Sequence, residues 1–304
     1  MVFLNKVTED VAQTVVDASS HWRDDQVACW KQACAEEEIP HAKWAMENFI
    51  KNAAVADKKH CALCDDTGTP HPFLEIGDEA VLPAGFLAAM EDGIRKGLND
   101  LPARPMGVRG DELERISQCK GLYDEPGMLK PAPTQIRRMA GSKIRLTILM
   151  LGGGPEIRSR TQALFHMHSL DHVVEEMIEW AVPQVAALGC QPCTLSFGLG
   201  RTAVEASSLS LEAMKDGCYD VQSEMEKRIT DAVNGKGIGR SAWVVPVRCL
   251  LHLLKSEICV RAVSGWFRCA RTAVWRFVKP PVNGRLYYNG NKGEEYERIN
   301  SGGI

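Results

Sequence analysis

The sequence contains no apolar run that approaches the roughly 18 to 20 residues of a membrane-spanning helix. Its first residues, MVFLNKVTEDVAQTV, include no apolar core followed by a cleavage site, so no secretory signal is expected. There is also no large excess of charge, since 36 Lys and Arg stand against 39 Asp and Glu, a net of −3. That balance offers no basic footprint for nucleic acid. We therefore expect a cytoplasmic protein that binds neither a membrane nor nucleic acid.

Cysteine, by contrast, is abundant, with 11 residues among 304. In the absence of an export signal these thiols are expected in a reducing compartment, where clustered cysteines more often bind metals or act in catalysis than form disulfides. The composition is otherwise that of an ordinary globular protein, 45% apolar and 25% charged. The length is sufficient for one large α/β unit with a sizeable core.

Two cysteine-bearing segments, CALCDDTGTP from Cys61 and CQPCTLSFGLGRTA from Cys190, lie about 125 residues apart. Both are rich in Gly, Pro and Thr, so we expect loops, and loops on a rigid scaffold are where ligands converge. The pairs Cys61/Cys64 and Cys190/Cys193 allow a zinc site with four thiolates, although this separation far exceeds a usual zinc-ribbon interval. A redox C-x-x-C motif and inert buried thiols are the other interpretations.

Hydrophobic periodicity predicts a mixed α/β fold. Helical spacing covers 7–55, with Trp22, Trp30, Trp44, Met46 and Phe49 as expected core residues. Strands are expected at 73–76 and 143–151, and further helices at 87–98, 171–188, 202–214 and 221–233. Ser169 or Asp171 is the expected N-cap of the helix 171–188. The segment 104–127 reads as a loop.

Glycine turns and histidines add weaker signals. The turn Gly152–Gly154 follows a strand and suits an anionic group, because its backbone N–H groups can face a carboxylate. Gly198 and Gly200 read as a second glycine loop, with Thr202 capping the next helix. His166, His168 and His172 have metal-ligand spacing, but a solvated loop is the favoured interpretation.

In chain order, the motifs match one pattern. Cys64, Asp66, Thr67, Gly68 and Thr69 come first, then LMLGGGPEIRSR, then CQPCTLSFGLGRTAVEA, and then DVQSEMEKRITDAVNGKGIG. Together, from Lys59 to Gly239, they resemble class I fumarases and the α subunits of L(+)-tartrate dehydratases. The resemblance implies the fold of the class I fumarase N-terminal domain, with mixed sheets flanked by helices.

The resemblance also implies a hydro-lyase that adds water to, or removes it from, a small dicarboxylic acid. Fumarate/malate is the first choice of substrate and L-tartrate the second. The expected cofactor is a 4Fe–4S cluster with one open iron acting as Lewis acid. By the same resemblance Cys64 and Cys190 are cluster ligands, and Asp66, beside the open iron, is a catalytic and substrate-binding residue. Arg104 binds substrate carboxylate, and Gly153 contacts substrate through its backbone.

The sequence departs from the family pattern at two of these segments. Asp65 stands where the family usually has Gln, and Leu151 stands where it has Lys before the triple glycine. The second domain of single-chain fumarases has no counterpart here. We therefore expect a separate β subunit to bring the base and the remaining substrate contacts, and this chain alone to be inactive.

The C-terminal segment differs in composition from the rest. Residues 240–304 hold 11 Lys and Arg, 4 Glu and no Asp, a net of +7, so residues 1–239 carry −10. Cys269 lies near the position expected for a third cluster cysteine, but the residues before it do not match. Read one nucleotide earlier, codons permitted by GRSAWVVP at Gly239 give Pro-Gln-Arg-Leu-Gly-Gly-Pro, which restores the family pattern. We therefore divide the chain into a hydro-lyase domain, 1–239, and an atypical basic tail, 240–304. A frame shift is the hypothesis for the origin of this tail, and a genuine but divergent tail is the alternative.

Overall fold

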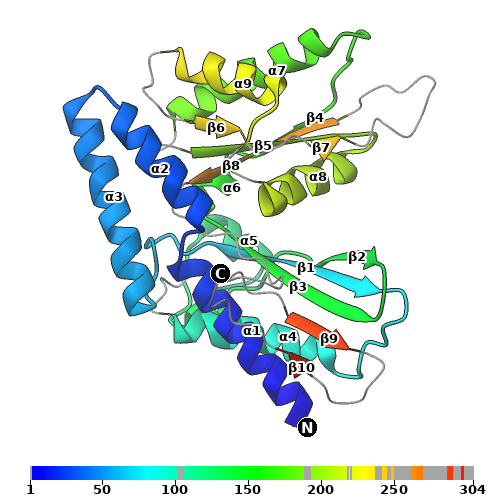
Figure 1. Cartoon of the computed structure of the whole chain (residues 1–304). Helices are drawn as coiled ribbons and strands as arrows, with labels where there is room; N and C mark the ends of the chain where they lie inside the picture. The colour runs from blue at the N-terminus through cyan, green and yellow to red at the C-terminus, as the bar shows by residue number, and fades with distance from the viewer. Residues whose placement is uncertain are drawn as a thin grey trace. The chain divides into compact units, whose positions relative to one another are not determined.

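A computed structural model describes residues 2–101, 104, 106–187, 193–217, 219 and 221–236, and the backbone of five short strands beyond residue 241. The chain divides into two compact units. Unit one comprises Met1–Arg23, Asn52–Leu151 and Thr272–Ile304, and unit two comprises Asp24–Lys51 and Gly152–Arg271. Each unit has its own mixed sheet and its own helices (Figure 1).

Unit one is built on the sheet β10-β9-β3-β1-β2, in which β1 runs antiparallel to β3 and parallel to β2. Its strands are β1 (Thr69–Gly77), β2 (Gln135–Met139), β3 (Lys143–Leu151), β9 (Leu286–Asn289) and β10 (Tyr296–Glu297). Its helices are α1 (Val2–Ser20), the second part of α3 (Pro40–Lys59), α4 (Phe86–Asp100), α5 (Glu112–Ser117) and the 3-10 helix η1 (Pro126–Met128).

The core of unit one depends on the close packing of α1 against α4 and on a buried strand. The last six residues of β3, Leu146–Leu151, are all buried, which explains their continuous apolar sequence. Gly93 and Gly97 lie on one face of α4, directly against α1. A Cβ atom at Gly93 would lie 2.6 Å from the Cβ of Val11, and one at Gly97 would lie 2.5 Å from the carbonyl oxygen of Ala12. Glycine is therefore required for the two helices to approach this closely.

Unit two is built on the sheet β4-β8-β5-β6, with β7 also paired to β5. Its strands are β4 (Arg160–Gln162), β5 (Cys193–Gly200), β6 (Ala242–Val244), β7 (Arg248–Cys249) and β8 (Ala262–Cys269). Its helices are α2 (Asp24–Glu36), the first part of α3, α6 (Gly153–Glu156), α7 (Leu170–Ala186), α8 (Ala203–Asp216) and α9 (Glu224–Asn234). In Figure 1, α7 and α9 lie on one side of β5 and α8 lies on the other.

The two faces of β5 are used differently. Leu195, Phe197 and Leu199 join one core cluster with the apolar faces of α7 and α9. The alternate positions include Gly198 and Gly200, which lie against the first turns of α8. The two glycines of the Gly-Leu-Gly sequence thus allow β5 and α8 to pack closely.

Most of the predicted elements are confirmed, including the mixed α/β class with sheets flanked by helices. The strand predicted at 143–151 is β3, and Ser169 and Thr202 cap α7 and α8. The glycine loop predicted at Gly198 and Gly200 is wrong, because these residues belong to a fully buried strand. Trp44 is also wrongly assigned to the core, since it is 67% exposed on α3. None of the described helices is long and apolar enough to cross a membrane.

The packing of β5 on α8 predicts a large cost for any side chain at Gly198. A Cβ atom there would lie 2.5 Å from the backbone nitrogen of Ser210 and closer still to the carbonyl oxygen of Ala206. Gly198→Ala should therefore lower the free energy of unfolding by about 1 to 3 kcal/mol, measured by urea denaturation. Gly154→Ala is the matched control, because a Cβ at Gly154 meets nothing within 4 Å. Equal stability of the two variants would contradict this account.

Candidate active site

The first cysteine segment forms a turn that is fastened to two helices of unit one. The side chain of Leu63, between the two cysteines, is buried. The Leu63 backbone N–H donates to the carbonyl oxygen of Ser19 at 2.9 Å, and its carbonyl oxygen accepts from Asn52 Nδ2 at 2.9 Å. The flanking Cys61 and Cys64 are half-buried. These two hydrogen bonds therefore fix the backbone of the turn, and both cysteines are partly exposed on it.

Cys64 and the two aspartates that follow it form a local hydrogen-bond network. The Asp66 backbone N–H points at Cys64 Sγ at 3.4 Å and at Asp65 Oδ1 at 3.0 Å. The Cys64 thiol also donates to Asp65 Oδ1, at 3.2 Å. The sulfur thus has a backbone donor on one side and a carboxylate partner on the other.

Arg104 lies at the same turn, although it follows α4 in the sequence. Its Nη1 lies 3.5 Å from Asp65 Oδ2, and the two side chains are 52% and 74% exposed. The structure therefore brings together Cys64 and Arg104, to which the resemblance assigns a cluster and a substrate carboxylate, and Asp65, where the sequence departs from the family pattern. The acidic residue next to the guanidinium is Asp65 rather than Asp66.

The beginning of β1, which follows this turn directly, is paired with the end of β3. Thr69, the first residue of β1, pairs with Leu151, the last residue of β3. Gly152 and Gly153 follow Leu151 and begin the short helix α6 in unit two, where the Gly152 carbonyl accepts from Glu156 N at 3.1 Å. The predicted glycine turn is therefore the first turn of a helix.

The second cysteine segment is described only from Cys193 onward, because Cys190 lies outside the described residues. Cys193 begins β5 and is buried, and this burial raises the pKa of its thiol to about 12. Such a thiol stays protonated and is a poor metal ligand. The backbone of Cys269 pairs with Cys193 across β5 and β8. Within the described residues, no group of three or more His, Cys, Asp or Glu side chains is arranged to hold a metal.

Comparison with known proteins decides the family. Residues 8–245 match the family model described as fumarate hydratase (fumerase). The chain belongs to the fumarate hydratase family. Its sequence is also 23% identical over 241 residues to a protein of Methanocaldococcus jannaschii named "Putative L(+)-tartrate dehydratase subunit alpha", covering 77% of this chain and 82% of that protein. Family membership makes the chain a hydro-lyase that acts on dicarboxylic acids.

Thr67 is a further candidate site residue, to which the motif assigned no role. It lies directly after Asp66 and is buried, and its Oγ1 has no hydrogen-bond partner in the described part of the chain. Buried hydroxyl groups are normally paired, so this atom is available to a bound group. Its place inside the D-T-G-T motif was the signal, but the sequence does not reveal burial.

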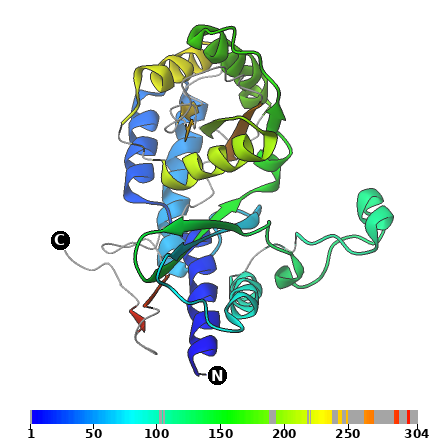
Figure 2. The ribbon, with the colours of Figure 1, turned by 90° about the vertical axis from the view of Figure 1, so that its right-hand side faces the viewer.

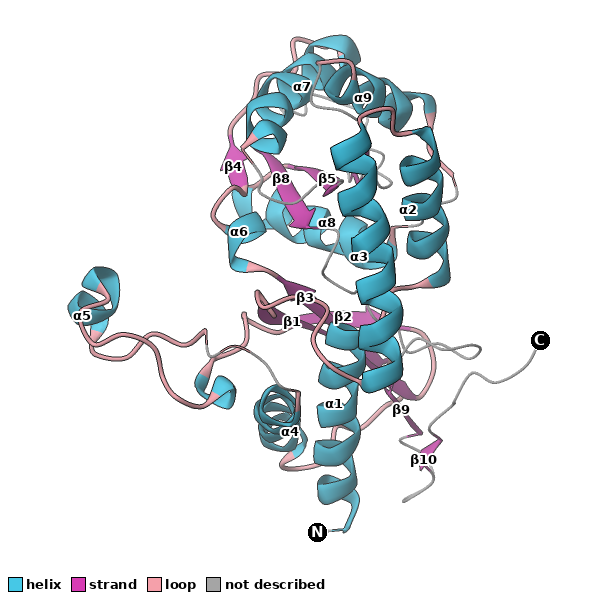
Figure 3. Ribbon diagram, turned by 90° about the vertical axis from the view of Figure 1, so that its left-hand side faces the viewer, coloured by secondary structure: helices cyan, strands magenta, loops and turns pink. Residues whose placement is uncertain are grey.

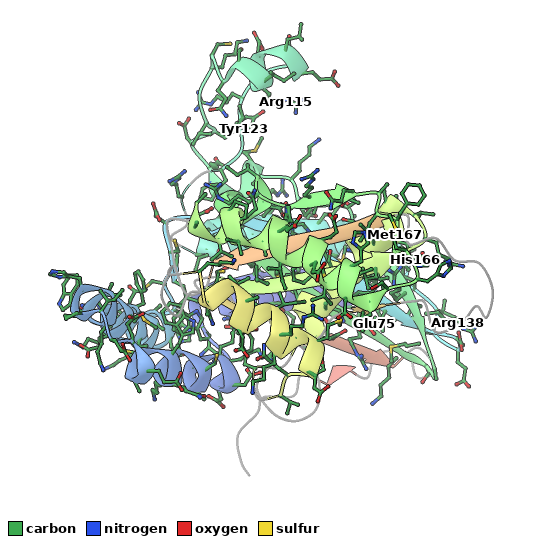
Figure 4. All side chains as sticks on the ribbon, turned by 90° about the horizontal axis from the view of Figure 1, so that it is seen from above. Glu75, Arg115, Tyr123, Arg138, His166 and Met167 are labelled. Carbon is green, nitrogen blue, oxygen red and sulfur yellow. The ribbon has the colours of Figure 1, made fainter. Side chains whose placement is uncertain are left out.

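The histidine spacing noted in the sequence belongs to a surface loop. The backbone N–H of His168 donates to His166 Nδ1 at 2.9 Å, and the two rings meet edge to face at 4.9 Å. Figure 4 shows His166 and Met167 at the outer edge of the chain. The solvated-loop interpretation is therefore confirmed for these residues.

The Asp65–Arg104 pair predicts a competition with substrate for the guanidinium. Replacing Asp65 by Asn removes the competing carboxylate, so a dicarboxylate substrate should bind Arg104 more tightly. An exposed ion pair contributes up to about 1 kcal/mol, so KM should fall by up to about fivefold with little change in kcat. The measurement is the steady-state turnover of a dicarboxylic acid by the active enzyme.

Asp78→Asn supplies the control for this prediction. Asp78 Oδ2 accepts from Arg138 Nη2 at 3.0 Å at the end of β2, and Arg138 lies at the periphery in Figure 4. Loss of this second exposed pair should leave KM unchanged. A rise in KM for Asp65→Asn would mean that Asp65 itself assists substrate binding.

Proposed function

We propose that this chain is the α subunit of an iron–sulfur-dependent hydro-lyase. Its substrate is a small dicarboxylic acid, with fumarate/malate the first choice and L-tartrate the second. The observation that carries the proposal is the position of Arg104 at the turn of Cys64, where Asp65 links the two side chains. A guanidinium beside a half-buried thiol combines a carboxylate anchor with a metal ligand, and a hydro-lyase of this family needs both.

The residues around Cys64 suit a cluster ligand. The thiol is half-buried on a turn, and a backbone N–H donates a hydrogen bond to its sulfur. The ligands of metal sites are commonly held in place by such hydrogen bonds. Cys64, Cys190 and Cys269 would hold three irons, and Cys193 would stay a buried thiol. When bound, such a cluster supplies a Lewis acid that polarises the substrate hydroxyl and carboxylate.

The protein groups would bind and orient the substrate. Arg104 would bind one substrate carboxylate by donating two parallel N–H hydrogen bonds to it, and would thereby displace Asp65. Asp66 would accept a hydrogen bond from the hydroxyl group that is added or removed. The Thr67 hydroxyl would donate a hydrogen bond to the substrate from the buried side of the turn. The Gly153 backbone N–H would bind the second carboxylate.

A β subunit would complete the site. The relative from Methanocaldococcus jannaschii is named as a subunit alpha, which supports a two-subunit enzyme. The β chain would carry the base and the remaining substrate contacts, so this chain alone would be inactive. A cytoplasmic location agrees with the free thiols of Cys29, Cys34, Cys61, Cys64, Cys119 and Cys193, the described cysteines.

The cluster predicts different outcomes for Cys64 and Cys193, one cysteine from each C-x-x-C pair. After anaerobic reconstitution with iron and sulfide, the chain should be brown and should bleach in air. Cys64→Ser should lose most of the bound iron, whereas Cys193→Ser should keep it, because the Cys193 thiol is buried and protonated. Iron and acid-labile sulfide assays measure both.

The same experiment tests the zinc alternative. A colourless protein that holds zinc, and that loses it with either Cys64→Ser or Cys193→Ser, would overturn the cluster proposal. The buried Cys193 argues against a zinc site that uses both pairs. Cys190→Ser extends the comparison to the cysteine that the family resemblance assigns as a ligand.

The third ligand depends on the origin of the tail. The family match ends at residue 245, close to Gly239, where the motif pattern stops, and this supports the frame-shift hypothesis. The nucleotide sequence from codon 230 through the next kilobase should encode Pro-Gln-Arg-Leu-Gly-Gly-Pro, a later cysteine, and then a β-subunit reading frame. An intact frame without this continuation would leave Cys269 as the third ligand, with iron content as its test.

A further inference from the structure

A long arm, residues 106–128, leaves unit one directly after the site arginine. It begins two residues beyond Arg104 and returns through η1 (Pro126–Met128) before β2. Figures 2 and 3, which view the chain from opposite sides, both show its helix, α5, apart from the sheet and the other α-helices of unit one. None of the residues of α5 is buried. The arm is therefore the most extended feature of this unit.

The arm is ordered by its own hydrogen bonds. Two chain segments at its base are joined by an isolated antiparallel bridge, with hydrogen bonds from Arg109 N to Gly121 O at 2.9 Å and from Tyr123 N to Gly107 O at 2.8 Å. Ion pairs of Arg109 with Asp124 and of Lys120 with Glu114, as well as a capping box between Asp111 and Glu114, fix its tip. Figure 4 shows Arg115 and Tyr123 along this projection. The backbone thus presents the tip in a defined conformation.

The tip presents an apolar pair to solvent. Leu113 and Ile116 lie three residues apart on one face of α5 and are 77% and 81% exposed. A helix of six residues is marginal in water unless its apolar side chains are buried. An arm that is internally ordered but apolar at its end has the form of a docking element, with these two side chains as anchors.

The charge around the anchors distinguishes between possible partners. The first turn of α5 is acidic, with Glu112 and Glu114 after the cap Asp111, and the arm as a whole holds five acidic and three basic residues. Residues 1–239 of this chain carry a net charge of −10. A second copy that received the tip on this part would bring like charges together. The charge of the arm therefore favours a different chain, with an apolar pocket and a basic rim, as the partner.

We infer that the arm is the element that docks the β subunit, which would receive Leu113 and Ile116 in an apolar pocket rimmed by Lys or Arg. This inference rests on the two-subunit part of the proposed function. It adds a mechanical link, because the arm starts two residues after Arg104. Docking of the arm would therefore tie the partner, through the backbone of the arm, to the segment that carries Arg104.

The test is complex formation between the full chain and a tagged β subunit from the same genome, followed by size-exclusion chromatography and titration. Leu113→Ser/Ile116→Ser should raise the Kd at least about tenfold. Glu112→Lys should also weaken binding and should reduce its salt dependence. Because these side chains are exposed, the melting temperature of the isolated chain should stay unchanged. Val81→Ser/Val204→Ser, at two exposed apolar positions elsewhere, should bind like the unaltered chain.

Three results would overturn the inference in different ways. If Leu113→Ser/Ile116→Ser binds the β subunit normally, the arm is not the docking element, and the two-subunit function stands. If the unaltered chain binds no β subunit under any of these conditions, the two-subunit proposal itself fails. If the unaltered chain forms a dimer of its own that Leu113→Ser/Ile116→Ser abolishes, the arm binds a second copy of this chain.

Discussion

The antiparallel pairing of β1 with β3 is the constraint on which the candidate site depends. The ladder runs from Thr69 opposite Leu151 to Ile76 opposite Ile144. Because the two strands run in opposite directions, the beginning of one and the end of the other meet at the same edge of the sheet. The cysteine turn precedes Thr69 and the glycine turn follows Leu151. Only the start of β3 alternates, with Lys143 exposed, Ile144 buried and Arg145 half-buried. A slip of one residue would move a charged side chain to the buried position of Ile144, so burial at this end fixes the register and the register fixes the edge.

Close backbone approach is the second constraint, and glycine provides it in both units. In unit one, Gly93 and Gly97 let α4 lie against α1, and in unit two Gly198 and Gly200 let β5 lie against α8. In each case the nearest atoms would include backbone or Cβ atoms, which cannot move aside as the end of a long side chain can. The Gly-x-Gly sequence before α8 therefore has a packing role that needs no ligand.

Local patterns in the sequence predicted most of the fold. The continuous apolar run at 143–151 and the caps Ser169 and Thr202 identified a strand and two helices, because these signals act within a few residues. The errors arose where packing decides. Trp44 reads as a core residue by type, yet its position on α3 exposes it, and the glycines of β5 read as a loop because their partner helix is not visible in a local pattern.

The sequence predicted which motifs contribute to the candidate site, but not how their residues contact one another. Cys64 and Arg104 were found by resemblance, but their meeting through Asp65 is a long-range contact that no spacing rule supplies. Burial of the Thr67 hydroxyl and of the Cys193 thiol also depends on the completed fold. Cys190 lies outside the described residues, so its role stays a prediction.

The division of the chain into units has a consequence for how the protein is made. Unit one is interrupted by Asp24–Lys51, so α1 is synthesised well before its partners α4 and β3. The apolar face of α1, which includes Val7, Val11 and Val15, must wait exposed until that later part of the chain has left the ribosome. Contacts of this sequence separation form slowly, since the intervening loop must first close. Correct synthesis therefore depends on keeping one early helix from binding the wrong surface while the rest of its core is still being translated.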